Sequence, residues 1–259
     1  MERLCNLFFE LSNEDRISIV RILSESPLNL TNLSKQLGVT NQECSRHLSR
    51  LMEEKIVEKT PDGLHRISPY GELITRTSRA QAFVVEHRDY FNTHTLTALP
   101  EEFVARMGEL SSSEYVDDVM VVFQNIERMF REAEQRAMRI TDHYLVLGVP
   151  ASLSAAERGV RFRIITPVDI EYPQDFEERT APFRRLMQEG HFTPREVERA
   201  DVFLAMSERE VAALSFPNRD GRFDYLGFTS RDDAALRWCE DLFEHYWERA
   251  RPKTNLPWM

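Results

Sequence analysis

Six polar side chains gather in one ten-residue stretch of the sequence. They are Asn41, Gln42, Ser45, Arg46, Ser49 and Arg50. In a helix these positions fall largely on one face, opposite the apolar positions Cys44, Leu48, Leu51 and Met52. Asn and Gln can bond adenine through two hydrogen bonds, Arg can bond guanine or a phosphate, and Ser accepts either kind of contact. The spacing therefore predicts a helix whose exposed face reads base pairs.

Two further helices are expected before this one, and the second of them is short. Ser12 is placed to cap a helix that ends before Pro27, because apolar residues recur between them at helical spacing. Thr31 is placed to cap a short helix over residues 32–37, and Gly38 can end it in a left-handed conformation.

The reading helix begins with a capping-box pattern at Thr40 and Glu43, and we expect it to run to about Glu54. A helix, a short helix, a glycine-containing turn and a second helix form the arrangement that lays the last helix in the major groove of DNA.

A hairpin is expected directly after this helix. Residues 56–60 and 64–67 are rich in strand-forming side chains, and the Asp62-Gly63 pair between them is a strong turn signal. Such a hairpin is the wing of a winged helix, from which His65 or Arg66 could reach the neighbouring DNA backbone.

This part of the chain resembles a known family. The residues that carry the resemblance are Gly38-Val39-Thr40, the run from Ser45 to Leu51, and Ile56-Val57. They resemble the ArsR-type winged helices of bacterial and archaeal repressors, which implies binding to double-stranded DNA. The paired thiols that bind metals in that family are missing, so we expect no metal site; a winged helix that contacts only protein stays an alternative.

Composition agrees with a globular protein of two parts. Of the net charge of −10, about −1 falls in residues 1–70 and −9 in residues 71–259, so DNA contact should be local to the first part. Three scattered cysteines, without a CxxC pair, fit a reducing cytoplasm. No apolar run is long enough for a membrane span, and no signal peptide is expected.

A connector helix is expected from Pro69 to about Asn92. Leu73, Thr77, Ala80, Val84, His87 and Phe91 recur at alternating spacings of four and three. This stripe fits either a seam between two copies of the chain or packing on the chain's own second domain. His87 and His94 are too isolated from other ligands to predict a metal site.

The second part interleaves helices and strands. Helices are expected over 113–137, 175–189 and 232–249, and strands over 143–149, 160–166, 200–205, 211–216 and 222–229. The fold class is therefore an α+β winged helix-turn-helix followed by an α/β domain, a sheet layered by helices. We place the DNA-binding domain at residues 1–68, connector and dimerisation helices at 69–112, and a sensor domain at 113–259.

Two further resemblances lie in this second part. The run from Glu157 to Ile165 resembles the strand entry of the phospholipase-D-like fold, which also underlies the sensor domain of TrmB-like archaeal regulators. Asp89-Tyr90-Phe91 with His94, the run 99–103, Gly108-Glu109-Leu110 and the ending Trp238, Leu242-Phe243, Tyr246-Trp247 resemble archaeal regulators of the methanogenesis-regulator type.

Phospholipase chemistry needs an HxK motif, in which a histidine attacks and a lysine stabilises the phosphoryl oxygens. The four lysines are Lys35, Lys55, Lys59 and Lys253, and none follows a histidine at this spacing. Phosphate-binding, dinucleotide and hydrolase motifs are missing as well, so we expect neither an enzyme nor a cofactor. The alternative is a phospholipase-D-like enzyme or adaptor whose winged helix only docks a protein.

A small anionic effector is expected at the strand ends of the α/β sheet. Arg161 and Arg163 share one strand face, Asp142 and Tyr144 lie at the mouth of one strand, and Arg199 and Asp201 at another. Ordinary surface ion pairs remain the alternative for each. The expected protein is a homodimeric transcriptional regulator that binds an operator, obeys this effector and could contact the transcription machinery.

Overall fold

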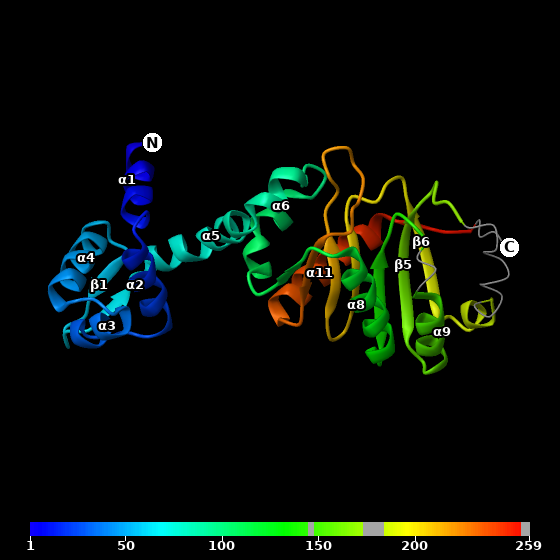
Figure 1. Cartoon of the computed structure of the whole chain (residues 1–259), viewed down its shortest axis with the longest axis horizontal. Coiled ribbons are helices and arrows are strands. Elements are labelled where there is room, and N and C mark those ends of the chain that lie inside the picture. The colour runs from blue at the N-terminus through cyan, green and yellow to red at the C-terminus, as the bar shows by residue number, and fades with distance from the viewer. Residues whose placement is uncertain (145–147, 173–183, 255–259) are drawn as a thin grey trace. The chain divides into compact units, whose positions relative to one another are not determined.

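The computed structural model describes residues 1–144, 148–172 and 184–254. The chain divides into two compact units, Met1–Arg79 and Ala80–Met259 (Figure 1). Within the described residues, no helix is both long and apolar enough to cross a membrane.

The first unit packs helices against a short hairpin. Its helices are α1 (Glu2–Leu11), α2 (Glu14–Glu25), α3 (Leu30–Leu37) and α4 (Asn41–Glu53), its strands are β1 (Val57–Lys59) and β2 (His65–Ile67), and α5 (Pro69–Glu86) leaves it. The two strands pair antiparallel. Ile19, Leu33, Cys44, Leu48 and Leu51 form the centre of its core. The expected winged helix-turn-helix is thus present, together with α1, which the sequence reading left out.

The helix caps differ partly from those expected. Asn13, not Ser12, caps α2, and Asn29, not Thr31, caps α3, because in each case the Asn side chain accepts the N–H three residues on. Gly38 ends α3 at a φ of 74°, as expected. The capping box at the start of α4 is also confirmed.

Gly71 lets α5 pack closely on the first unit. A Cβ atom at this position would lie 2.2 Å from the carbonyl oxygen of Ile56. The Ser68 hydroxyl accepts the N–H of Gly71 at 2.9 Å and so caps the first turn of the helix. Only glycine therefore fits where α5 crosses Ile56, the residue before β1.

The second unit is built on an eight-stranded mixed sheet, in the order β10-β6-β5-β4-β7-β8-β9-β3. The strands are β3 (Glu114–Val116), β4 (Arg136–Ile140), β5 (Arg161–Pro167), β6 (Phe192–Val197), β7 (Phe203–Ser207), β8 (Val211–Ser215), β9 (Gly227–Ser230) and β10 (Arg251–Pro252). Among the described strands, β4, β5 and β6 are the ones that pair in parallel, so their carboxyl ends meet at one edge.

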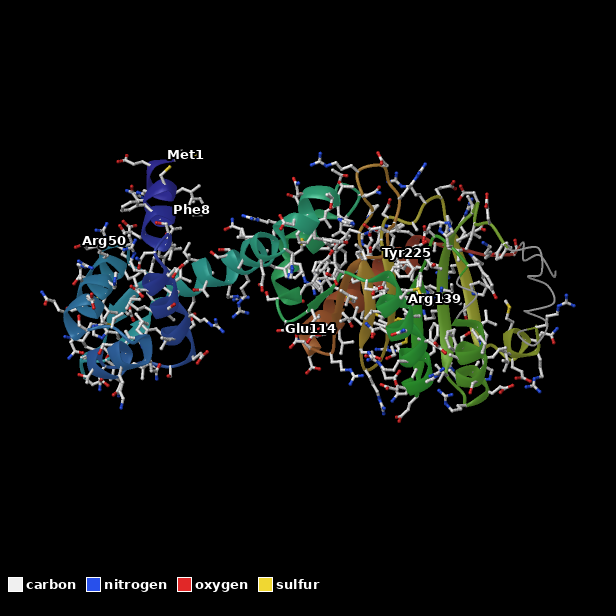
Figure 2. The ribbon with its side chains drawn as sticks, viewed as in Figure 1. Met1, Phe8, Arg50, Glu114, Arg139 and Tyr225 are labelled. Atoms are coloured by element: carbon white, nitrogen blue, oxygen red, sulfur yellow. The ribbon has the colours of Figure 1, made fainter. Side chains whose placement is uncertain are left out.

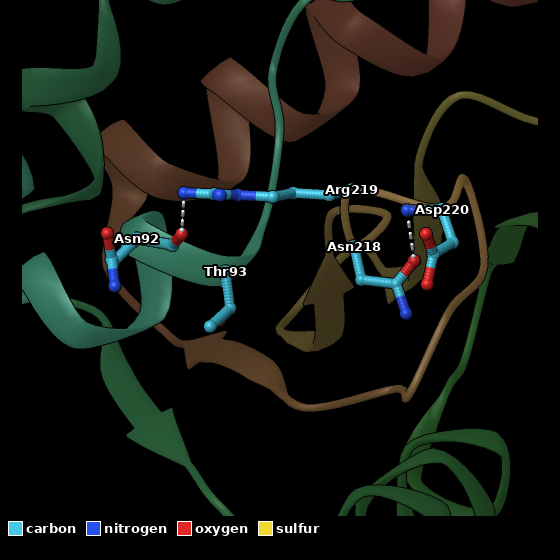
Figure 3. A pocket seen from close by; sticks show the side chains of 5 residues that line it. All are labelled: Asn92, Thr93, Asn218, Arg219 and Asp220. Carbon is cyan, nitrogen blue, oxygen red and sulfur yellow. Dashed lines mark hydrogen bonds between the residues drawn. The ribbon is translucent and has the colours of Figure 1, made fainter.

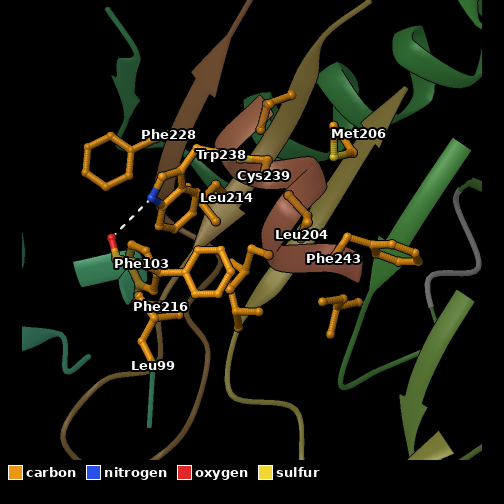
Figure 4. Close-up of a cluster of buried hydrophobic side chains, with 14 of the residues drawn as sticks. Leu99, Phe103, Leu204, Met206, Leu214, Phe216, Phe228, Trp238, Cys239 and Phe243 are labelled. Atoms are coloured by element: carbon orange, nitrogen blue, oxygen red, sulfur yellow. Dashed lines mark hydrogen bonds between the residues drawn. The ribbon is translucent and has the colours of Figure 1, made fainter. Parts of the chain in front are cut away.

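Helices cover both faces of this sheet. The helices α8 (Val119–Glu132) and α9 (Val149–Glu157) pack on one face. The other face is covered by α11 (Asp233–Arg249), α6 (Arg88–Thr93), α7 (Glu101–Ala105) and the short 3-10 helix η1 (Met107–Leu110). Trp238 lies at the centre of this second layer and donates its indole N–H to the carbonyl oxygen of Phe103 at 3.2 Å (Figure 4). The expected helix-layered α/β sheet is confirmed.

Several expected elements of the second unit were wrong in detail. The helix expected over 113–137 is strand β3, helix α8 and the start of β4, so Ala137 packs from a strand. Of the strand expected over 143–149, residues 145–147 lie outside the described residues, and Val149 begins α9. Most of the helix expected over 175–189 also lies outside them, and only residues 184–188 are described as helical.

The connector is two helices instead of one. Helix α5 ends at Glu86, and α6 begins after His87. Ala80, Val84 and Phe91 of the expected seam pack on the core of their own unit, whereas Leu73 is 60% exposed. Packing within the chain, one of the two alternatives, is thus confirmed for Ala80, Val84 and Phe91.

Replacing Gly71 with Ala should destabilise the first unit. In an exposed helix the same change stabilises by about 1 kcal/mol, but here the new methyl group meets the Ile56 carbonyl. We expect a loss of roughly 1–3 kcal/mol in the free energy of unfolding, measured by urea denaturation. Thr77→Ala, on the exposed face of the same helix, is the control and should change it by less than about 0.5 kcal/mol. A Gly71→Ala protein as stable as the wild type would contradict this packing.

Candidate DNA-binding surface and ligand site

One face of helix α4 packs into the core of the first unit, and the opposite face is exposed to solvent. Cys44, Leu48 and Leu51 are buried in the core, and the imidazole of His47 lies 3.4 Å from the Asp15 carboxylate. The exposed face carries four polar side chains that make no side-chain bond to any other described side chain: Gln42, Ser45, Arg46 and Ser49. These groups are free to bond a partner molecule.

Asn41 has a structural partner at the start of this helix. Its side-chain oxygen accepts the hydroxyl of Ser34 at 2.5 Å, which ties α4 to the preceding α3. The side-chain NH₂ group stays available for an adenine contact, but not together with the oxygen while that bond holds.

Arg50 is engaged by the N-terminal helix. Its guanidinium donates to both carboxylate oxygens of Glu10, with Nε at 2.8 Å, and lies 5.6 Å from the centre of the Phe9 ring. Glu10 is only 6% exposed, and Arg16 donates to its backbone oxygen and, at 3.0 Å, to that of Phe9. The hydrogen bond from Arg50 holds the pKa of Glu10 below its usual range. Arg50 thus joins α1 to α4 and is not a free reading group.

Of the two wing residues that were expected to reach the DNA backbone, one is buried and the other is exposed. His65 is buried and pairs through its backbone with Leu28, and burial lowers the pKa of its imidazole. Arg66 is exposed and forms an ion pair with Glu58 on the facing strand at 2.6 Å. Of the two, only Arg66 is accessible to a DNA backbone.

Two hollows lie where the three parallel strands end. One of about 260 Å³ is lined by Asp142, Arg199 and Asp169, among others. The next, of about 450 Å³, is lined by Arg199, Asp201 and Tyr246, among others. Asp142 accepts a hydrogen bond from the Tyr225 hydroxyl at 3.2 Å, and Arg199 pairs with Asp201 at 2.8 Å. The structure thus brings three of the six expected ligand residues to one edge.

The other three do not line these hollows. Arg161 lies exposed at the amino end of β5, at the opposite edge. Arg163 donates to both carboxylate oxygens of Glu244 and faces the Trp247 ring at 4.1 Å, so its charge is neutralised within the protein. Tyr144 follows β4, where its ring lies 6.1 Å from that of Tyr172.

A third hollow, of about 280 Å³, is lined by residues with polar side chains. It lies between α6 and the loop after β8, and Figure 3 shows the Arg219 guanidinium donating to the carbonyl oxygen of Asn92 at 2.7 Å. Nearby, His94 stacks on Tyr90 and lies 3.1 Å from a carboxylate oxygen of Asp224. Among the described residues, no three His, Cys, Asp or Glu side chains gather as a metal site.

In comparisons with known proteins, each of the two parts of the chain matches one family model. Residues 11–60 match the family model of a helix-turn-helix domain, and residues 138–249 match that of the middle domain of the methanogenesis regulatory protein FilR1. The chain is thus similar to a helix-turn-helix domain in its first part and to the FilR1 middle domain in its second. The expected resemblance is confirmed, and this pairing is that of a DNA-binding transcriptional regulator. No curated protein matches the chain.

Several solved structures are similar at low identity. TrmBL2, an archaeal chromatin protein, is 16% identical with a TM-score of 0.43, over 93% of this chain and 94% of that chain. NucT from Helicobacter pylori is 10% identical with a TM-score of 0.42, over 55% and 98%. The phospholipase D family member Nuc from Salmonella typhimurium is 12% identical with a TM-score of 0.37, over 50% and 89%.

Sequence reading missed Glu10 and Arg16. The spacing of Leu4, Leu7 and Leu11 was a signal for helix α1, but nothing in the sequence pairs Glu10 with a residue 40 positions away. That ion pair is visible only once the helices are packed.

Glu10→Gln should weaken the attachment of α1. The change removes the charge that Arg50 and Arg16 share, and leaves Arg16 buried beside a neutral amide. We expect the free energy of unfolding to fall by about 1–3 kcal/mol, measured by urea denaturation. Glu53→Gln, exposed at the end of α4, is the control and should have almost no effect.

The same pair predicts a pH dependence. Because the folded protein holds the pKa of Glu10 below the unfolded value, its stabilisation is complete above the unfolded pKa and is lost as pH falls through the folded pKa. Glu10→Gln should flatten this acid limb of the stability curve. An unchanged acid limb would show that Glu10 is not a stabilising carboxylate.

Proposed function

We propose that this chain is a homodimeric transcriptional regulator that binds a two-fold symmetric operator in double-stranded DNA. Helix α4 would enter the major groove with Gln42, Ser45, Arg46 and Ser49 toward the bases, and the wing would place Arg66 near the backbone. A small ligand at the carboxyl edge of the sheet would control binding, and contact with the transcription machinery would follow DNA binding.

The observation that carries this proposal is that α4 has one face buried in the core and one exposed face whose polar side chains bond no other described side chain. A reading helix needs side chains that are positioned by the fold and yet have unused donors and acceptors. The capping box and the buried face of α4 fix its position. Arg46 has no ion pair with a described residue, so its guanidinium can bond guanine or phosphate without breaking a contact.

Two features support the remaining parts. One winged helix reads a short half-site, and a dimer doubles both the contacts and the specificity. The hollows at the carboxyl edge lie where ligands bind in open α/β sheets, and Asp142, Arg199 and Asp201 give that edge polar side chains.

Arg46→Ala should weaken operator binding by about 1–3 kcal/mol, because a lost guanidinium removes a base or phosphate contact. Affinity is measured by gel-shift titration at fixed salt. If the lost contact is to phosphate, the salt dependence should also become shallower by about one counterion.

The matched control is Arg237→Ala, which removes an exposed arginine of the second unit and should leave affinity unchanged. Unfolding curves of both variants should superimpose on that of the wild type. Equal affinities for wild type and Arg46→Ala would remove this residue from the interface.

Selection of bound sequences from a random DNA pool tests the dimer. We expect a two-fold symmetric motif with half-sites about 34–36 Å apart, or a multiple of that spacing. A single asymmetric half-site would reject the dimer. No enrichment, or cleavage of the pool, would favour instead the adaptor or the phospholipase-like enzyme.

A further inference from the structure

Asn41, the first residue of α4, is bonded to the helix before it. Its side-chain oxygen lies 2.5 Å from the hydroxyl of Ser34, a residue of α3 that is only 4% exposed. Asn41 itself is exposed, so the bond holds one of its two polar ends and leaves the other accessible. Residues at the start of a recognition helix contact base edges in the major groove. The bond therefore acts on a residue that is in a position to read DNA.

The length of this bond decides which end of the Asn41 amide faces Ser34. Hydrogen bonds from a hydroxyl to an oxygen span about 2.5–3.0 Å, whereas those from an N–H group to an oxygen span about 2.7–3.2 Å. A distance of 2.5 Å thus fits the amide oxygen and is too short for the NH₂ group. The carbonyl oxygen of Thr31 lies 3.0 Å from the same hydroxyl, but its single hydrogen favours the shorter contact.

The bond leaves Asn41 with donors only. Its NH₂ group makes no hydrogen bond to a described residue, and all residues of the first unit are described. When Asn reads adenine, its oxygen accepts from N6 and its NH₂ group donates to N7, so both ends must face the same base. The bond to Ser34 turns the oxygen towards α3 instead. Guanine N7 and O6 and thymine O4 are acceptors that suit the remaining NH₂ group, whereas the N4 group of cytosine is a donor.

The fold between the two helices keeps these two side chains together. Gly38 ends α3 at a φ of 74°, and the capping box of Thr40 and Glu43 begins α4 directly at Asn41. Both backbone positions are thus fixed, so only two short side chains must be ordered to form the bond to Ser34, and short side chains lose little entropy.

Arg50, which Figure 2 labels, shows the same kind of restriction near the other end of α4. Its guanidinium is held by the carboxylate of Glu10, so the whole reading group is occupied. At Asn41 the bond occupies only the acceptor and leaves the donors. A bond within the first unit thus selects what each of these side chains offers to DNA.

We propose that Ser34 is a positioning residue that makes Asn41 a hydrogen-bond donor to one base of the operator, so that Asn41 selects guanine or thymine against adenine and cytosine. The inference rests on the proposed function, because it requires that α4 enters the major groove. It adds a residue of α3 that touches no base and yet sets which base is preferred.

The test uses the full-length protein and the DNA motif that it selects from a random pool. Selection with Asn41→Ala identifies the base that this side chain reads, because the preference is lost at that position. Gel-shift titrations at fixed salt then compare operators that carry each of the four bases there. We expect the wild type to bind the guanine or thymine operator about tenfold more tightly than the adenine operator.

Ser34→Ala should relax this preference. Without the hydroxyl, the amide oxygen is free to turn to the base, and the adenine operator should gain roughly tenfold relative to the guanine operator. In the Asn41→Ala background the same change should leave base preference unaltered, because Ser34 acts through Asn41. Ser24→Ala, which removes a hydroxyl bonded to the Val20 carbonyl oxygen in α2, is the matched control and should change nothing.

Asn41→Asp tests the same bond without a change at the buried Ser34. An aspartate carries oxygens at both ends and no donor, so the preference should move to cytosine, whose N4 group donates. Urea unfolding curves of both variants establish that they are folded under the conditions of the titration.

Four results would overturn the role of Ser34: no base whose preference depends on Asn41, a wild-type preference for adenine at that base, an unchanged preference in Ser34→Ala, or an effect of Ser34→Ala that persists without Asn41. Each of them leaves operator binding itself intact, so it rejects this inference alone. A failure to select any DNA would instead reject the operator proposal, and this inference with it.

Discussion

The second unit depends on two strands that are buried on both faces. Every residue of β7 and β8 is buried, and along β7 the side chains alternate, with Phe203 and Ala205 toward α8 and Leu204 and Met206 toward α11. Such strands are stable only if helices cover both faces. With the faces covered, the carboxyl edge of β4, β5 and β6 stays open, and the two hollows lie there.

In the first unit, the ion pairs among Glu10, Arg16 and Arg50 fix the position of α4. None of these three residues is among the side chains proposed to contact DNA. Glu10 and Arg16 are both buried, and Arg50 shields the carboxylate from the solvent side. Because the backbone of α4 is already in place, binding a partner need not order it, and this lowers the entropy cost of binding. In the proposed complex, DNA contacts would come from neighbouring positions on one face of α4, which suits a unit whose net charge is near zero.

Local signals in the sequence predicted the first unit well. The capping box, Gly38 and the Asp62-Gly63 turn each act within a few residues, so α4 and the wing could be predicted before packing was known. Contacts between residues distant in the chain could not be predicted in this way. Arg50 is paired with Glu10, and His65 is paired through its backbone with Leu28. In the second unit, a buried helix and the buried strand after it can form one continuous apolar run. The spacing of apolar residues then does not show where the helix ends, so Ala137 was assigned to a helix although it lies in β4.

Arg139 and Arg163 show why residue type alone does not identify a binding site. They lie on neighbouring parallel strands, and the register places Arg163 beside Met138 and Arg139 beside Ile164. Because side chains alternate along a strand, Arg163 extends toward α11, where it contacts Glu244 and two aromatic rings, and Arg139 extends toward α8, where its guanidinium carbon lies 5.7 Å from the centre of the Phe130 ring. An arginine within its own carboxylate pair gains little from an added anion, because the anion must first displace that carboxylate. The sequence shows two arginines of the same type on two strands, and only the packing of the helices decides that Arg163 is neutralised within the protein.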